Sequence, residues 1–112
     1  MQKSSRFLKK VPFFTGLSDE DLDSVFSVMV ERFYPKGDLF FLEGDPGEAL
    51  FVIKEGRVKI SKSSVDGREQ ILHILGGGAI FAEVVLFDRG PYPATAEAAE
   101  DTTCWLLHNE AM

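Results

Sequence analysis

Glycines at nearly equal intervals divide most of this chain into short segments. Gly37, Gly47, Gly56, Gly67 and Gly76 follow one another at steps of 10, 9, 11 and 9 residues. Each interval holds a run rich in apolar or β-branched residues, which is typical of a strand bounded by turns. Turn signals at this spacing predict an all-β sandwich or barrel. The predicted strands are Leu39–Leu42, Ala49–Lys54, Val58–Lys62 and Gln70–Leu75.

Alternating side chains predict which face of a strand is solvated. Val58 and Ile60 alternate with Lys59 and Ser61, as expected for a strand with one buried and one solvated face. The last segment, 94–108, holds two more candidate strands around an acidic turn. That gives roughly eight strands in all, enough for a jelly roll.

Two helices are predicted before the strands. Residues 7–11 form a short amphipathic segment, which Pro12 ends. A second helix is expected to begin at Ser18, a good N-cap residue, because three acidic residues follow it and suit the positive end of the helix dipole. Residues 1–30 are therefore assigned to N-terminal helices of the same domain as the β part, 31–112. The expected buried side of the second helix is Leu22, Val25, Phe26 and Met29.

Length and composition indicate an ordinary soluble domain. The 112 residues leave room for one domain, and 45% are hydrophobic and 27% charged. No apolar run approaches the roughly 20 residues that cross a bilayer, and no signal peptide is recognisable, so a cytoplasmic location is expected. The single cysteine, Cys104, cannot form an internal disulfide and is expected to be a small buried hydrophobe.

The charge of the chain argues against nucleic-acid binding by these residues. The net charge is −6, whereas a nucleic-acid surface usually carries a basic stripe that neutralises phosphates. The one basic concentration, at Arg6, Lys9 and Lys10, is too small for that purpose. Sequence-specific DNA binding is therefore not expected from this chain alone.

One stretch interrupts the β pattern. Three glycines at 76–78 lead into an apolar run at 81–87, followed by a loop with Gly90, Pro91 and Pro93. The pattern predicts a single helical turn inside a β domain, and such interruptions often carry binding sites. A long loop with a helical plug under the barrel is the alternative.

Three ordered stretches resemble the cyclic-nucleotide-binding fold, and specifically the Crp/Fnr regulators. They are VPFFTGLS at 11–18, GDPGEALFVIKEGRV at 44–58 with its Gly-x-Val, and FAEVVLFDRGPYPATA at 81–96. The resemblance implies a double-stranded β-helix jelly roll with a short cassette helix, whose N-terminus would bind a phosphate. It also implies that a homodimer of the parent protein binds DNA through a C-terminal dimerisation helix and helix-turn-helix, neither of which is in this sequence.

The resemblance assigns roles within the cassette at 81–96. Glu83 takes the position of the glutamate that holds the ribose, but Ala82 stands where the family has glycine, and Tyr92 where it has the phosphate-binding arginine. Losing a charge-assisted contact lowers affinity by about tenfold to a few hundredfold, so cyclic AMP is not the expected ligand. By family position, Ile60 and Leu72 line the cavity for a planar group. The predicted ligand-binding residues are Ile60, Leu72, Phe81, Ala82, Glu83, Val84, Val85, Tyr92, Pro93, Ala94 and Thr95.

Several of these residues have a structural alternative. Glu83 suits either a ligand contact or a helix cap, and Tyr92 either closes the pocket or is an exposed loop aromatic. Ile60 and Leu72 suit plain barrel core equally well. Arg89, three residues before the expected arginine, is interpreted as a solvated turn residue.

The cassette is also similar to the branch of regulators of nitrate respiration and nitrosative stress, some of which sense nitric oxide through haem. Haem needs only one or two axial ligands, and His73 is the candidate, with a hydrogen-bonded strand histidine as the ordinary interpretation. A metal-dependent jelly-roll enzyme is disfavoured, because such a site needs about three protein ligands and the chain has two histidines. We therefore expect a non-enzymatic sensor domain that binds a small-molecule effector, with a cyclic-nucleotide-binding module as the alternative.

Overall fold

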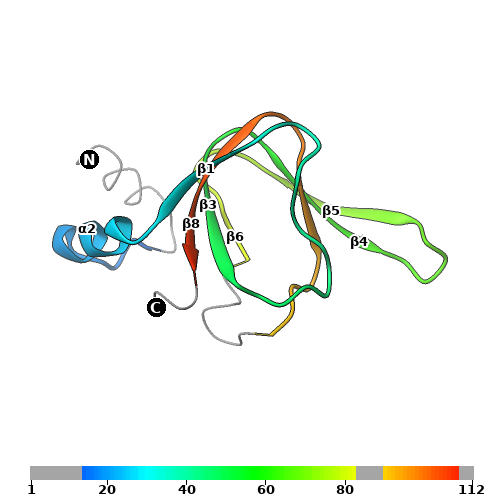
Figure 1. The fold of residues 1–112 in the computed structure, drawn as a ribbon, viewed down its shortest axis with the longest axis horizontal. Coiled ribbons are helices and arrows are strands. Elements are labelled where there is room, and N and C mark those ends of the chain that lie inside the picture. The colour runs from blue at the N-terminus through cyan, green and yellow to red at the C-terminus, as the bar shows by residue number, and fades with distance from the viewer. Residues whose placement is uncertain (1–13, 83–89, 109–112) are drawn as a thin grey trace.

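The computed structural model describes residues 14–82 and 90–108. These residues form one helix and two four-stranded antiparallel sheets, with strand orders β1-β8-β3-β6 and β2-β7-β4-β5 (Figure 1). The all-β jelly-roll prediction is confirmed. The elements are α2 Asp19–Ser27, β1 Val30–Tyr34, β2 Leu39–Phe41, β3 Ala49–Glu55, β4 Val58–Ser63, β5 Glu69–Leu75, β6 Ile80–Phe81, β7 Thr95–Ala98 and β8 Thr102–His108.

Helix α2 begins where the sequence predicts. The Ser18 hydroxyl accepts a hydrogen bond from the Asp21 N–H at 3.1 Å, which caps the helix. Leu22 is fully buried, while Val25 and Phe26 are partly buried against the core. The first predicted helix lies outside the described residues. No helix in the described ranges is long and apolar enough to cross a membrane.

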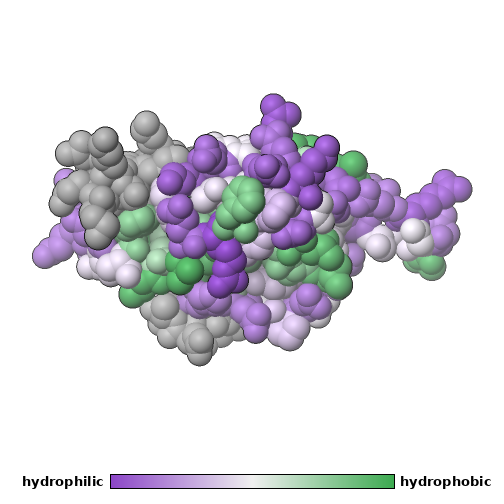
Figure 2. All heavy atoms as spheres, turned by 45° about the horizontal axis from the view of Figure 1, so that its top comes forward, coloured by the Kyte–Doolittle hydropathy of each residue, from purple (hydrophilic) through white to green (hydrophobic). Residues whose placement is uncertain are grey.

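The β4–β5 hairpin projects from the rest of the domain, and mostly hydrophilic residues cover its far end (Figures 1 and 2). Lys59 forms ion pairs with Glu69 at 3.2 Å and Glu97 at 3.5 Å. The expectation that Ser61 faces solvent is wrong, since its exposed fraction is 4%. Strand β4 is interior, with β7 on one side and β5 on the other, so a small side chain is covered by its neighbours.

The core is built around β3, which lies between β8 and β6 and buries five successive residues, 49–53. Burial on both faces explains the uninterrupted apolar run ALFVI. Trp105 on β8 is buried, meets Phe26 edge to face at 5.3 Å, and donates its indole N–H to Glu31 at 3.1 Å. Helix α2 is thereby attached to the sheet through an aromatic pair.

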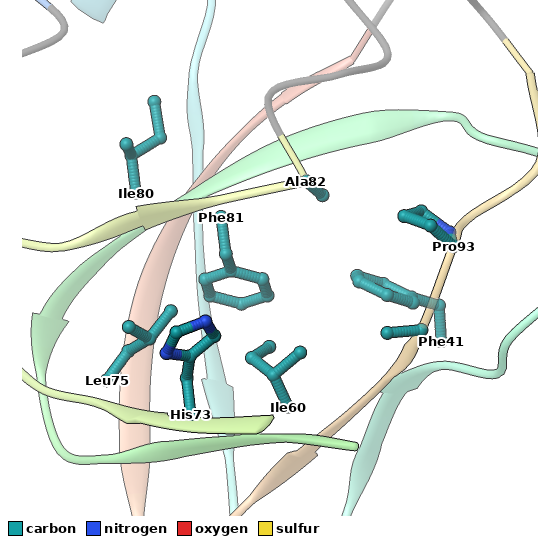
Figure 3. Close-up of a pocket in the computed structure, with 9 residues that line it drawn as sticks. Phe41, Ile60, His73, Leu75, Ile80, Phe81, Ala82 and Pro93 are labelled. Carbon is teal, nitrogen blue, oxygen red and sulfur yellow. The ribbon is translucent and has the colours of Figure 1, made fainter. Parts of the chain in front are cut away.

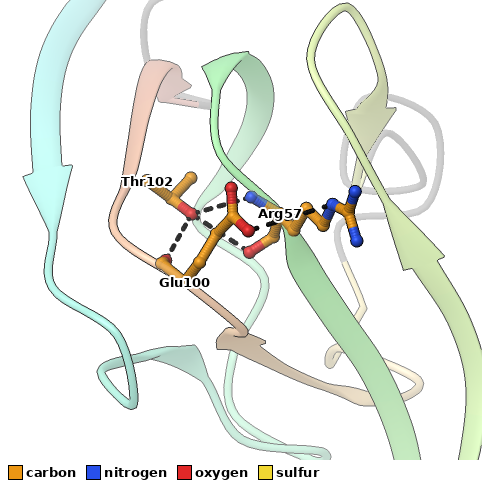
Figure 4. A network of polar contacts seen from close by, with 3 residues as sticks. All are labelled: Arg57, Glu100 and Thr102. Carbon is orange, nitrogen blue, oxygen red and sulfur yellow. Dashed lines mark hydrogen bonds and ion pairs between the residues drawn. The ribbon is translucent and has the colours of Figure 1, made fainter.

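The turn between β3 and β4 is joined to β8 by the buried hydroxyl of Thr102 (Figure 4). This oxygen accepts the Arg57 N–H at 3.1 Å and lies 3.0 Å from the Arg57 carbonyl and 2.8 Å from that of Glu100, to either of which it can donate. Gly56 precedes this contact with φ +112°, a conformation that favours glycine. The glycine of the Gly-x-Val motif is therefore explained by the backbone conformation of this turn.

Cys104 is fully buried on β8, as predicted. Burial raises the pKa of its thiol from 9.0 to about 12, because the thiolate would be desolvated. We expect the folded protein at pH 8 to react with a thiol reagent at least 100-fold more slowly than the unfolded chain, since the thiolate is the nucleophile. Stopped-flow measurements with and without urea test this, and equal rates would contradict the burial.

Candidate functional site

A cavity of about 370 Å³ opens between the two sheets beside the cassette. In Figure 3, Ile60, His73 and Leu75 from the β4–β5 hairpin lie below Phe81, and Phe41 and Pro93 lie at the right of the view. The volume is at the small end of the range for ligand pockets, about 300–1,000 Å³. Its described lining residues are Phe41, Ile60, His73, Leu75, Ile80, Phe81, Ala82, Pro93 and Ala94.

The described wall of this cavity is apolar with one exception. His73 is the only titratable side chain in it, and no lysine, arginine or carboxylate belongs to it. Phe41 and Phe81 supply flat aromatic surface, with ring centroids 6.2 Å apart. Such a wall suits a planar, largely apolar molecule that offers one hydrogen-bond or coordination partner to an imidazole.

The structure brings five of the predicted ligand-binding residues together around this cavity. They are Ile60, Phe81, Ala82, Pro93 and Ala94. Three others, Glu83, Val84 and Val85, lie outside the described residues, as does Arg89. The remaining three, Leu72, Tyr92 and Thr95, are described and do not line the cavity.

A bulge in the hairpin explains the position of Leu72. Ile60 pairs with His73, while Ser61 pairs with Ile71, so Leu72 is an extra residue without a partner on β4. Its side chain is 41% exposed. Sequence reasoning placed His73 here only as a possible haem ligand and missed Leu75. The two share one face of β5 by simple alternation, a signal that was available.

Tyr92 is buried, with an exposed fraction of 5%, and its ring stacks on Phe41 with centroids 3.7 Å apart. Its hydroxyl oxygen accepts the N–H groups of Glu48 and Ala49, both at 3.1 Å, and donates to the Ala49 carbonyl at 3.1 Å. The interpretation of Tyr92 as an exposed loop aromatic is therefore wrong, and the wall of this cavity contains Phe41, on which Tyr92 stacks, and not Tyr92 itself. Phe41 itself was not predicted, because its position depends on this stack.

The segment around Tyr92 is hydrogen-bonded to the turn between β2 and β3. Tyr92 N–H donates to the Asp45 carbonyl and the Tyr92 carbonyl accepts from Gly44, both at 2.8 Å. Gly47 N–H donates to the Gly90 carbonyl at 3.2 Å. Thr95 accepts the Glu43 N–H at 2.9 Å through its side chain. These bonds fix the C-terminal half of the cassette from residue 90 onward.

Ala82 has φ +65°, in the left-handed region that glycine favours. We expect Ala82→Gly to raise the free energy of unfolding by about 0.5–1 kcal/mol: relief of roughly 1–2 kcal/mol of strain exceeds the entropy that glycine adds to the unfolded chain. Urea denaturation measures the change. Ala79→Gly is the matched control, since Ala79 has no positive φ and should lose stability. A destabilised Ala82→Gly would show that the backbone is not strained.

The described residues hold no group of three histidine, cysteine, aspartate or glutamate side chains that could bind a metal ion. His108 lies on β8 and lines a different cavity from His73. A protein-bound metal site of the kind found in jelly-roll enzymes therefore has no ligand set in ranges 14–82 and 90–108.

Comparisons with known proteins agree with this architecture. The family model described as cyclic nucleotide-binding domain matches residues 31–112. The Cyclic AMP receptor protein of Thermus thermophilus is 38% identical over 103 residues, which are 92% of this chain and 48% of that protein. The chain thus spans about half the length of this curated relative.

Two solved structures are similar over almost the whole chain. The N-terminal domain of a transcriptional regulator from Streptomyces coelicolor has a TM-score of 0.89 at 37% identity, covering 95% of this chain and 74% of that one. The sensor domain of the transcriptional regulator DNR from Pseudomonas aeruginosa has a TM-score of 0.89 at 28% identity, covering 98% and 75%. With the family match over residues 31–112, these likenesses show that the chain belongs to the cyclic nucleotide-binding domain family.

Proposed function

We propose that this chain is the effector-sensing domain of a Crp/Fnr-type transcription regulator, and that its effector is a planar, largely apolar molecule and not cyclic AMP. The domain has no catalytic role in this proposal. It works in the cytoplasm, where the effector shifts the parent protein between two states. DNA contacts and dimerisation belong to parts of the parent outside these residues.

The observation that carries the proposal is the absence of a cationic side chain from the described wall of the cavity. A cyclic nucleotide brings a phosphate that must exchange water for compensating charge or hydrogen bonds. The residue at the family's arginine position, Tyr92, is buried behind Phe41, and its hydroxyl is already bonded to the backbone. Pro93, the next residue, offers neither an N–H nor a hydroxyl.

Calorimetry with cyclic AMP and cyclic GMP tests the exclusion. We expect no saturable heat at micromolar ligand, because a phosphate would be desolvated against apolar walls. A dissociation constant in the micromolar range or below would overturn the proposal, and would give this chain the ligand in the name of its Thermus thermophilus relative.

A gain-of-function variant tests the positions themselves. Ala82→Gly, Tyr92→Arg and Pro93→Ser together are expected to create measurable cyclic-nucleotide binding. The matched control, Ala82→Gly with Pro93→Ser, keeps Tyr92 and should bind nothing. Circular dichroism must show that the triple variant is folded, because it loses the Tyr92 hydrogen bonds. A folded triple variant without affinity would contradict the assignment of Tyr92 to the arginine position.

Haem is a second candidate effector, because the one imidazole in the described wall could serve as an axial ligand. The fit is chemical: His73 supplies a nitrogen donor, and Phe41, Phe81, Ile60 and Leu75 supply an apolar surface for a macrocycle. When bound, haem would supply an iron centre for a diatomic gas. Every other contribution would come from the protein, which places His73 opposite Ile60 in the β4–β5 pairing and supplies the apolar walls.

Absorption spectra of the purified chain with added haem, with and without nitric oxide, test this candidate. A Soret band is expected to shift on binding, and His73→Ala is expected to abolish the shift. His108→Ala, which removes the second histidine from a different cavity, is the matched control and should bind as the unmodified chain does. Equal spectra for His73→Ala and the unmodified protein would exclude His73 as the ligand.

A further inference from the structure

A second cavity of about 220 Å³ shares the ring of Phe41 with the first. It lies among β1, β8, β3 and the turn that Tyr92 holds. Five aromatic side chains contribute to its wall: Tyr34, Phe40, Phe41, Phe51 and Tyr92. Three of them are buried, and Phe40 stands 4.1 Å from Tyr34 and 5.5 Å from Phe51, centroid to centroid. The aromatic part of the wall is therefore continuous.

Charges of both signs line the same cavity. Arg32 comes from β1, while Asp45 and Glu48 come from the turn between β2 and β3. One Asp45 oxygen, Oδ2, accepts the Leu42 N–H at 3.0 Å, which leaves the other available. Within the described residues, Arg32 and Glu48 form no ion pair. One cationic and two anionic residues, all of them exposed, thus border an aromatic pocket, and no ion pair joins them within ranges 14–82 and 90–108.

The arginine is close to the aromatic wall. Burial raises the pKa of the Tyr34 hydroxyl, and the neighbouring Arg32 guanidinium opposes that rise. A guanidinium beside an aromatic ring offers a fork of donors that matches a carboxylate. The carboxylates of Asp45 and Glu48, together with the aromatic rings of the wall, suit an ammonium group.

We propose that this second cavity binds a small zwitterion, an α-amino acid with an apolar side chain. Its carboxylate pairs with Arg32, its ammonium group with Glu48 and Asp45, and its side chain contacts the aromatic rings. The volume is below the range for drug-sized ligands, which favours a molecule of about this size. A zwitterion can pair with both signs of charge on this rim, whereas a ligand with only one charge pairs with one of them.

An occupant of this cavity would touch the same two residues that separate it from the first. Tyr92 lines only the second cavity, whereas Phe41 lines both and is stacked on Tyr92. The binding of an amino acid could therefore shift Phe41 in the wall of the effector cavity through its stack with Tyr92. This inference does not depend on which effector the first cavity binds, although the two cavities share Phe41.

Calorimetry on the 112-residue chain tests the proposal with L-valine, L-leucine and L-phenylalanine. For the tightest of them, the methyl ester removes the carboxylate and the N-acetyl derivative removes the ammonium group. We expect saturable binding of at least one amino acid, and at least tenfold weaker binding of both derivatives. No saturable binding by any of the three, or an ester that binds as tightly as its amino acid, would overturn the zwitterion assignment.

Two charge-neutralising variants locate the site. Arg32→Gln and Glu48→Gln are each expected to weaken amino-acid binding at least tenfold while leaving the circular dichroism spectrum unchanged. Arg68→Gln and Glu20→Gln change exposed charges that line neither cavity, so they serve as matched controls. Equal loss in controls and site variants would show that net charge, and not this cavity, governs binding.

Discussion

Gly56→Ala is expected to lower the free energy of unfolding by about 3 kcal/mol or more, from two costs that add. A φ of +112° is unfavourable for any residue with a Cβ. In addition, an ideal Cβ would lie 2.6 Å from the Thr102 Cα and 2.7 Å from the Asp101 carbonyl oxygen. Both are backbone atoms, so they cannot turn aside as a flexible side chain can. The clash also falls on the Thr102 hydroxyl that joins the β3–β4 turn to β8.

Gly37→Ala separates the two costs. Gly37 has φ +93°, but a Cβ there would meet no atom within 4 Å. Its expected loss is only about 1–2 kcal/mol, the cost of a left-handed conformation. Urea denaturation followed by the fluorescence of Trp105, the single tryptophan, measures both variants. If the two lost equal stability, close approach to Thr102 would contribute nothing at Gly56.

The evenly spaced glycines predicted the strands because each of the five lies between two consecutive strands. Gly37, Gly56 and Gly67 have positive φ, which only glycine adopts freely. Strands β1 and β6 were not predicted from the sequence. Strand β1 has a largely exposed pattern, and β6 is two residues long, so neither carries the apolar alternation by which a strand is recognised.

The candidate site was only partly predictable, because its shape depends on contacts between residues far apart in sequence. Ile60 and Phe81 were placed correctly at the cavity by the resemblance. The bulge that leaves Leu72 without a partner on β4 is a property of β4–β5 pairing, which one strand's sequence does not encode. The second cavity forms only where β1, β8 and the β2–β3 turn come together, so no single sequence motif predicts it.

The role of Tyr92 likewise depends on residues far away in the sequence and could not be predicted. The sequence reveals that an arginine is missing from the family pattern, but not what the tyrosine does in its place. Its hydroxyl partners, Glu48 and Ala49, precede it by 44 and 43 residues. A residue interpreted as part of a ligand site proves to hold one turn of the β-roll against another.

Truncating that contact is expected to be the second large effect. Tyr92→Ala should cost about 3–5 kcal/mol, the usual range for removing a buried aromatic side chain, because it leaves a void beside Phe41. Tyr92→Phe keeps the ring and its stack but leaves two backbone N–H groups and one carbonyl without the hydroxyl. Its expected cost is about 1–3 kcal/mol, because unsatisfied buried polar groups must be desolvated.

Comparing the two variants separates the contribution of the Tyr92 ring to stability from that of its hydroxyl. Urea denaturation measures the free energy of unfolding of each. Tyr34→Phe is the matched control, since Tyr34 is only partly buried and its hydroxyl makes no hydrogen bond to the backbone of the described ranges. It should change stability by less than Tyr92→Phe does. A Tyr92→Phe variant as stable as the unmodified protein would mean that water replaces the hydroxyl at Glu48 and Ala49. The turn at 44–49 would then be held to residues 90 and 92 by the backbone bonds and by the packing of the ring at position 92 on Phe41.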